Sequence, residues 1–215
     1  MIFAQLGNLK QLVVLSALGT VLGCGGPSAV PAPKFDPEGA AASAMELHDA
    51  NGDGSIDAEE LKKAPALKAA LKTLDTDNNG QVSEEEIVER VKAWDRSQIG
   101  ATIFDCTVLL NGQPLEGAKV TFEPAEFLGD VIIEAVSTTN IMGRTSPKIP
   151  KEKRPTADFP PGMQAGAYVV RISKTRDGKE MIPAKYNTES ILGQEVAKDD
   201  WAINNKQVRF ELKTK

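Results

Sequence analysis

Histidine and cysteine are scarce in this chain of 215 residues, which holds one histidine and two cysteines. A catalytic zinc site built from two histidines and a glutamate is therefore excluded. Positive charge is not in excess either, because the formal net charge is -5, and aromatic residues make up only 5%. The basic, aromatic-rich stripe of a nucleic-acid binder is missing, as are a G-x-S-x-G elbow, a phosphate-binding loop and a C-x-x-C pair. We expect neither an enzyme nor a nucleic-acid partner.

The N-terminus carries the pattern of a targeting segment. Lys10 is followed by QLVVLSALGTVLG, an apolar run that is short for a membrane span and ends in small residues and a cysteine. The stretch VLGCGG resembles the lipobox of bacterial lipoproteins. This resemblance implies that residues 1–23 are a signal peptide and that Cys24 is lipidated. Residues 24–35 would then tether the protein to a membrane of the cell envelope, on its periplasmic or outer-surface side. The alternative is a buried helix that happens to contain Cys24.

Negative charge is concentrated in one part of the chain. Residues 36–96 hold 15 acidic against 7 basic side chains, whereas residues 97–215 hold 15 against 16. The acidic part also repeats itself: DANGDGSIDAEE begins at Asp49, and DTDNNGQVSEEE begins 26 residues later at Asp75. This part of the chain is therefore a candidate for binding cations.

Each repeat places oxygen atoms where a loop that wraps a calcium ion needs them. Calcium takes six to eight hard oxygen ligands, so such a loop supplies side chains at positions 1, 3, 5, 9 and 12, a carbonyl at position 7 and a glycine at the sharp turn. The glycines are Gly54 and Gly80. With four carboxylates against three, the first loop is predicted to bind calcium more tightly at equal rigidity. The candidate ligands are Asp49, Asn51, Asp53, Ser55, Asp57 and Glu60 in the first loop, and Asp75, Asp77, Asn79, Gln81, Ser83 and Glu86 in the second.

The residues that flank the loops have helical spacing. Before the loops, inward positions are predicted for Ala41, Ala44, Met45, His48, Leu67, Ala70, Leu71 and Leu74, and after them for Ile87, Val91 and Trp94. Together with the loops, these residues resemble an EF-hand pair over residues 36–96. The resemblance implies two bound calcium ions and a short antiparallel bridge between Ile56 and Val82. The alternative is a degenerate pair that keeps the helices and has lost the metal.

Beyond residue 99 the hydrophobic period changes to two, which is typical of strands. In VRFELK, Val208, Phe210 and Leu212 point one way and the charged residues point the other. Cys106 shares a strand face with Phe104 and Val108, so we expect a buried core thiol and no nucleophile. The turn signals between strands favour a small antiparallel β-sandwich. The fold class predicted for the chain is therefore α+β, with two domains.

Several stretches of this half, NGQPLEGA, YVVRIS and PAKYN among them, resemble the carboxypeptidase regulatory-like domains of planctomycete lipoproteins. The resemblance covers residues 99–215 and implies a seven-stranded, transthyretin-like sandwich that acts as a spacer or binding module. One basic segment, RTSPKIPKEKRPTADFPPG, carries Lys148, Lys151, Lys153 and Arg154. We favour a solvated insertion between strands over a docking loop for an anionic envelope polymer, because lysine and proline also protect sheet edges.

The leading hypothesis is a lipid-anchored envelope protein that binds two calcium ions. Outside the cytoplasm calcium is plentiful and steady, so the ions are expected to be mainly structural. The sandwich would serve as an interaction or spacer module toward an envelope protein or polysaccharide. A second hypothesis is a calcium-responsive adaptor whose helices open to bind a partner. A third is an enzyme, for which clustered carboxylates in a deep cleft of the sandwich would be the sign; Asp199 and Asp200 are more simply turn caps.

Overall fold

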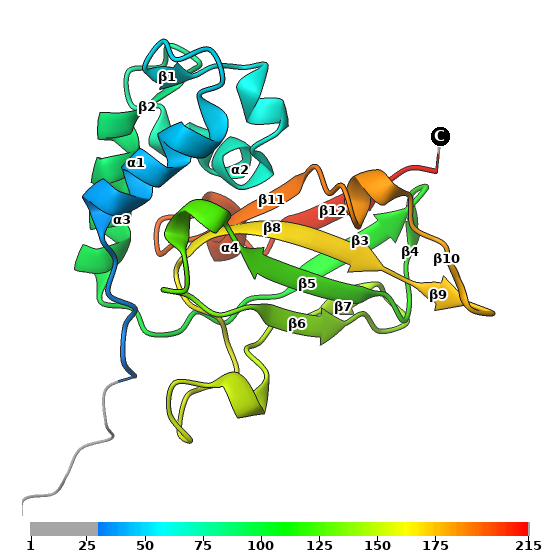
Figure 1. Cartoon of the computed structure of the whole chain (residues 1–215). Helices are drawn as coiled ribbons and strands as arrows, with labels where there is room; N and C mark the ends of the chain where they lie inside the picture. Colours follow the sequence, from blue (N-terminus) through cyan, green and yellow to red (C-terminus); the bar gives the residue numbers. More distant parts are fainter. Residues whose placement is uncertain (1–29, 215) are drawn as a thin grey trace, which may run out of the picture.

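The computed structural model describes residues 30–214, in which a helical part is followed by a β-rich part (Figure 1). The predicted signal peptide and the predicted lipidation site Cys24 lie outside the described residues. Within residues 30–214, no helix is both long and apolar enough to cross a membrane.

The helical part contains α1 (Pro37–His48), α2 (Pro65–Leu74) and α3 (Glu84–Ser97). Each helix begins at a residue suited to that place. The Asp36 side chain caps α1 by accepting a hydrogen bond from the Gly39 amide at 3.1 Å, and proline opens both α1 and α2. At α3, Ser83 and Glu86 form a reciprocal capping box.

The short spacing between the two acidic loops is accommodated by a single turn of 3₁₀ helix, η1 (Glu60–Lys62). Proline at position 65 then begins α2, as expected from the sequence. The core of the helical part is small: α1 contributes only alanines to it, and α2 and α3 supply the larger side chains. Its buried apolar members are Ala40, Ala41, Ala44, Ile56, Leu61, Ala64, Ala66, Leu67, Ala70, Leu74, Val82, Ile87, Val91 and Trp94. Met45, His48 and Leu71, also expected to point inward, are only half-buried.

The β-rich part contains two four-stranded sheets and a separate hairpin. Its strands are β3 (Cys106–Leu110), β4 (Gln113–Pro114), β5 (Lys119–Pro124), β6 (Ala135–Thr138), β7 (Arg144–Thr145), β8 (Gly166–Ser173), β9 (Thr175–Arg176), β10 (Lys179–Glu180), β11 (Leu192–Val196) and β12 (Val208–Leu212). Short helices interrupt the connections: the 3₁₀ turns Glu126–Leu128, Lys151–Lys153 and Ala184–Tyr186, and α4 (Trp201–Asn204).

The first sheet has the order β11-β8-β5-β6 and is antiparallel throughout. In the second sheet β3 is the central strand, with β4 and β7 on it in antiparallel pairing. The expectation of a wholly antiparallel sandwich is wrong at one place, because β12 runs parallel to β3, with Val208 beside Cys106. Between β11 and β12 the chain passes through α4. Strand β12 then starts beside the start of β3, so the two strands run in the same direction.

Aromatic rings fill the space between the two sheets. Phe122 of β5 contacts Phe104, Tyr168 and Phe210 with ring centroids 6.0–6.3 Å apart and edge-on geometry. The predicted alternation in β12 is confirmed, since its three apolar side chains are buried and the two charged ones between them are exposed. Cys106 is buried in the same core as a free thiol.

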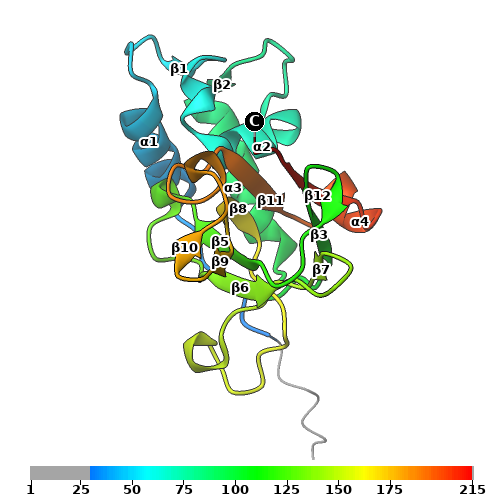
Figure 2. The same ribbon diagram turned by 90° about the vertical axis from the view of Figure 1, so that its right-hand side faces the viewer.

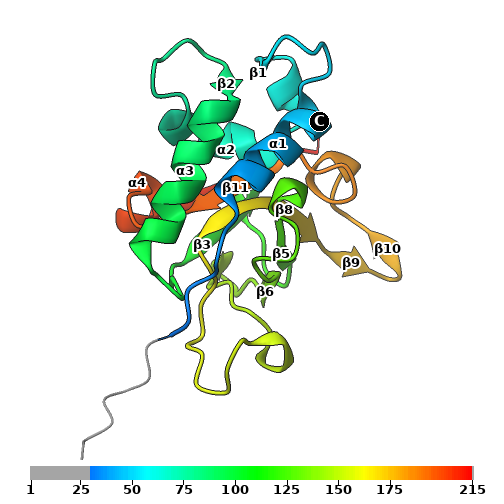
Figure 3. The same cartoon turned by 60° about the vertical axis from the view of Figure 1, so that its left-hand side comes forward.

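The helical part lies on the outer face of the first sheet, with α2 against β11 and β8 (Figure 3). Gly193 makes this close approach possible. A side-chain carbon at this position would lie 1.9 Å from the Pro65 carbonyl oxygen, so only glycine lets the start of α2 come so near to β11. The acidic loops project from the end of the molecule opposite the segment that contains Lys151–Lys153 (Figure 2).

Candidate metal centre

The two repeated loops lie side by side and are joined by a two-residue bridge. Strand β1 (Ser55–Ile56) pairs with β2 (Val82–Ser83), and Ile56 is directly opposite Val82. Both of these apolar side chains are fully buried. The predicted bridge is therefore confirmed, and it fixes the position of one loop relative to the other.

In the first loop the chain folds back around its own carboxylates. Asp49 accepts hydrogen bonds from the amides of Gly52, Asp53 and Gly54 at 2.8–3.2 Å. Glu60, at the other end of the loop, accepts from the amides of Ala50 and Asn51 at 2.8 and 3.2 Å. The carboxylates at positions 1 and 12 are thus both hydrogen-bonded to backbone amides of the loop between them.

The second loop repeats this arrangement. Asp75 accepts from the Asn79 amide at 3.0 Å and from the Gly80 amide at 2.9 Å. Glu86 accepts from the amides of Thr76 and Ser83 at 2.8 and 3.0 Å. The equivalent residues therefore have equivalent roles in the two loops.

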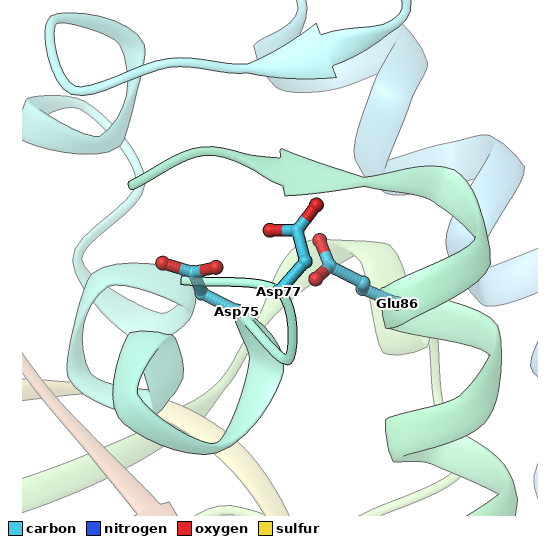
Figure 4. Close-up of side chains that lie close together, drawn as sticks. All are labelled: Asp75, Asp77 and Glu86. Carbon is cyan, nitrogen blue, oxygen red and sulfur yellow. The ribbon is translucent and has the colours of Figure 1, made fainter. Parts of the chain in front are cut away.

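Three carboxylates of the second loop converge on one point. Asp75, Asp77 and Glu86 each offer an oxygen atom, and these atoms lie within 4.8 Å of one another (Figure 4). Among residues 30–214, no three carboxylates of the first loop bring their oxygen atoms this close together. The structure therefore gathers the predicted ligands more tightly in the second loop, although the first has more carboxylates.

The remaining predicted ligands support the loops through hydrogen bonds. Asn51 donates to Asp53, and Asn79 donates to Asp77, each at 2.9 Å. Asp57 accepts from the Glu60 amide at 3.0 Å, at the start of η1. Ser55 and Gln81 connect the two loops, because the Ser55 hydroxyl donates to the Gln81 side chain at 2.9 Å. Ser83 caps α3.

The sharp turn within each loop requires glycine. Gly54 and Gly80 have φ angles of +88° and +82°, a region that side chains with a β-carbon rarely adopt. The positions two residues earlier, Gly52 and Asn78, also have positive φ, at 72° and 59°. The backbone therefore follows the same path in both loops, as the glycine at the same position of each loop predicts.

Hydrogen bonding favours the charged form of two of these carboxylates. The pKa of Asp53 is lowered by hydrogen bonds from Ser55 and Asn51. For Glu86, burial is the largest single influence and opposes ionisation, but the hydrogen bonds from Ser83 and Thr76 outweigh it and lower the pKa. The lowered pKa of each group favours the carboxylate anion, which is the form that binds a cation.

Five residues outside the loops form a polar cluster beneath them that sequence reasoning did not identify. Glu195 of β11 and Arg90 of α3 are both buried, with 2% and 7% of their side chains exposed. The only signal in the sequence was Arg90, a charged residue between Ile87 and Trp94 on the apolar face of its helix. Its partner Glu195 lies 105 residues away, and periodicity could not have found it. The cluster consists of Thr73, Arg90, Trp94, Glu195 and Asp199.

The acidic part of the chain matches the model of a known protein family. The EF hand family model matches residues 43–64 and 67–92, which include both loops and parts of the helices around them. A search of curated proteins finds no match to the chain. The family match and the acidic cluster agree in indicating calcium binding in this part of the protein.

The residues present fit a calcium ion on chemical grounds. Asp75, Asp77 and Glu86 supply hard, anionic oxygens from one loop, and the backbone amides hold those oxygens toward the common point. Asn79, the Gln81 carbonyl and Ser83 are the further groups that this loop would offer. A bound calcium ion would neutralise the mutual repulsion of the three carboxylates and so hold α2 and α3 together at the loop.

Proposed function

We propose that this chain is a calcium-binding protein of the bacterial cell envelope, anchored by a lipid on Cys24, in which two EF-hand loops hold structural ions. The observation that carries the proposal is the convergence of Asp75, Asp77 and Glu86 in a loop whose backbone and flanking helices are repeated in the first loop. We propose further that the β-rich part is a carboxypeptidase regulatory-like, transthyretin-like module that has no catalytic role.

A structural role for the ions is supported by the small core of the helical part. Helix α1 buries only alanines, which contribute little apolar area. Without a cation, the acidic loops at its end would repel one another. Calcium would thus supply folding free energy that the core does not provide.

A calorimetric calcium titration of metal-stripped residues 25–215, with a thermal melt at each end point, tests this function. Two sites well below millimolar, together with a large rise in melting temperature, are expected. The variants Glu60→Gln and Glu86→Gln should each remove one site. Weak binding near ambient calcium, or a helical part equally stable without metal, would favour the calcium-responsive adaptor instead.

Metabolic labelling with a fatty acid in a bacterial host tests the anchor. The chain offers a matched control, because its only other cysteine is the buried Cys106. The wild type and Cys106→Ala are expected to carry the label and to fractionate with membranes. Cys24→Ala should do neither, and labelled Cys24→Ala protein would refute the anchor.

For the β-rich part, we propose an acidic polysaccharide of the envelope as the partner. A row of three residues crosses the second sheet: Thr107 of β3 lies between Arg209 of β12 and Arg144 of β7. They line a cavity of about 460 Å³ together with Lys206, Gln207 and Val208. Among residues 30–214, no carboxylate lines this cavity, although Glu211 lies 3.5 Å from Arg209. The charge of the cavity complements an anionic sugar.

Binding to a uronic-acid polymer and to a neutral glucan of similar length tests this partner. The variant Arg144→Glu/Arg209→Glu should abolish retention on the acidic polymer. Arg176→Glu/Lys179→Glu, which reverses two charges on the exposed β9–β10 hairpin, should keep it. Equal loss in both variants would mean that only net charge matters, and the proposed site would be wrong.

A further inference from the structure

The helical and β-rich parts meet at a buried carboxylate that contacts both helices of the second EF hand. Glu195 of β11 accepts hydrogen bonds from Arg90 Nε at 2.5 Å and Trp94 Nε1 at 2.8 Å through Oε1. Its other oxygen, Oε2, accepts from the Thr73 hydroxyl at 2.6 Å. Thr73 belongs to α2, whereas Arg90 and Trp94 belong to α3. One side chain of the sheet is therefore bonded to the helix that enters the loop and to the helix that leaves it.

These contacts lie close to the two ends of the second loop. Thr73 is two residues before Asp75, which begins the loop, and Arg90 is one helical turn after Glu86, which ends it. Asp75 and Glu86 are two of the three converging carboxylates. A change in the separation of α2 and α3 at Glu195 would therefore move these ligands relative to each other.

The surroundings of Glu195 hold it in place. Its side chain is almost fully buried, so its three hydrogen-bond donors, and not water, stabilise the carboxylate. Arg90 is in turn held by Asp199, to which Nη1 and Nη2 donate at 2.8 Å each. Two residues earlier on the same face of β11, Gly193 lets the start of α2 lie against the strand. The sheet thus supports α2 near both of its ends and α3 near its middle.

We propose that Glu195 is a positioning residue for calcium binding: a carboxylate of the β-rich part that sets the spacing of α2 and α3 and so preorganises the second loop. The inference rests on the proposed calcium-binding function. The first loop lies between α1 and η1, which make none of these hydrogen bonds. Through Glu195, the β-rich part therefore acts on the calcium affinity of the second loop, whereas its contact with the first hand is the separate one between the turn Glu126–Leu128 and α1.

The test measures each loop separately in the full-length chain, kept in mild detergent because of its apolar N-terminal run. Glu60→Gln serves as the background that reports the second loop, and Glu86→Gln as the background that reports the first. In these backgrounds, Glu195→Gln should weaken calcium binding by the second loop about tenfold, as loss of a supporting hydrogen-bond partner does at other metal sites. Affinity of the first loop should stay nearly unchanged.

Two further variants keep the test decisive if Glu195→Gln does not fold. Thr73→Val keeps the shape of the side chain but removes the hydroxyl that bonds Glu195 and, locally, the Ala70 carbonyl, and it should still weaken the second loop selectively. Arg96→Gln, on the exposed end of α3, removes only a contact of 3.9 Å to Glu89 and touches neither α2 nor Glu195, so it should leave both affinities nearly unchanged. Circular dichroism in saturating calcium would show whether each variant is folded.

The outcomes separate the two proposals. If the second loop binds no calcium in the Glu60→Gln background alone, the proposed function fails, and the inference fails with it. If it binds calcium but Glu195→Gln and Thr73→Val change both loops equally, or neither, Glu195 is merely a structural residue and the positioning role is wrong.

Discussion

Arg90 of α3 donates its Nε to Glu195 of β11 across 2.5 Å, and both side chains are buried between the helical part and the first sheet. The pair joins segments 105 residues apart in the chain. A buried ion pair contributes little to net stability compared with an apolar pair of similar size. Removing one partner is nevertheless strongly destabilising, because the other charge is then left buried without a counter-charge. The pair therefore makes the two parts dependent on each other.

We predict that Arg90→Met lowers the free energy of unfolding by about 3–5 kcal/mol, because Glu195 is then left buried without its counter-charge. Arg90→Met/Glu195→Met should be less destabilised than the single variant. Urea unfolding in chelator measures both. The control Arg96→Met, on the exposed end of α3, removes only a contact of 3.9 Å to Glu89 and should change stability by less than about 1 kcal/mol. Additive effects of the two buried substitutions would show that the pair is not coupled.

Gly193→Ala is predicted to loosen the same interface from the side of α2. The new methyl group would lie 1.9 Å from the Pro65 carbonyl oxygen, so helix and strand must separate, at a cost of about 1–3 kcal/mol. Thermal unfolding with calcium removed measures the change. Glu189→Ala, an exposed position shortly before β11, is the control and should leave the melting temperature unchanged. A normal melting temperature for Gly193→Ala would mean that α2 does not rest on β11 as described.

The local features of this fold could be predicted from the sequence. The glycine turns and the proline that opens α2 depend on residues close together in the chain, and the structure confirms them. The Ile56–Val82 bridge, which joins residues 26 positions apart, is implied by the resemblance of the repeated loops to an EF-hand pair, and it is confirmed too. The alternation in β12 was also predictable, because burial on one sheet face imposes a period of two.

The long-range features could not be predicted in the same way. The parallel pairing of β12 with β3 depends on where the chain re-enters the sheet after α4, and no local pattern records it. The contact between Glu195 and α3 joins a charged residue of a strand to a charged residue of a helix, and either could equally have faced water. Asp199 and Asp200, both expected to cap a turn, in fact differ: Asp200 caps α4, whereas Asp199 pairs with Arg90.

Glu86→Gln should remove calcium binding at the second loop while leaving α3 capped. Glutamine can replace glutamate in a capping box, so the helix is expected to keep its N-terminus. The loss of an anionic, bidentate ligand should weaken the affinity at least tenfold, or about 1.4 kcal/mol. Calorimetry gives the affinity and circular dichroism gives the helix content. Glu85→Gln, the neighbouring residue outside the set of ligands, should retain the affinity. If Glu86→Gln bound calcium normally, the second site would not use position 12.

Acid is predicted to destabilise the contact between Asp199 and Arg90. Hydrogen bonds and charge from Arg90 lower the pKa of Asp199 in the folded protein, so its contribution to stability is complete above the unfolded pKa of about 4. It is lost as the pH falls through the lower, folded value. Urea unfolding midpoints between pH 6 and pH 2.5 should therefore fall less steeply for Asp199→Asn than for the wild type. Asp158→Asn, on an exposed loop, should follow the wild type. Parallel curves for the wild type and Asp199→Asn would contradict the prediction.

The thiol of Cys106 is predicted to be unreactive in the folded protein. Burial raises its pKa to about 12, so almost none of it is thiolate at pH 8, and the surrounding core blocks access to reagents. In a Cys24→Ala background, a thiol-specific reagent should label Cys106 only when β3 separates from its neighbours. The labelling rate should rise with urea in step with unfolding of the β-rich part. If calcium also slows the labelling, the stability of the loops is transmitted to the sheets through the interface at Glu195. If calcium stabilises the helical part but does not change the labelling rate of Cys106, the two parts unfold independently.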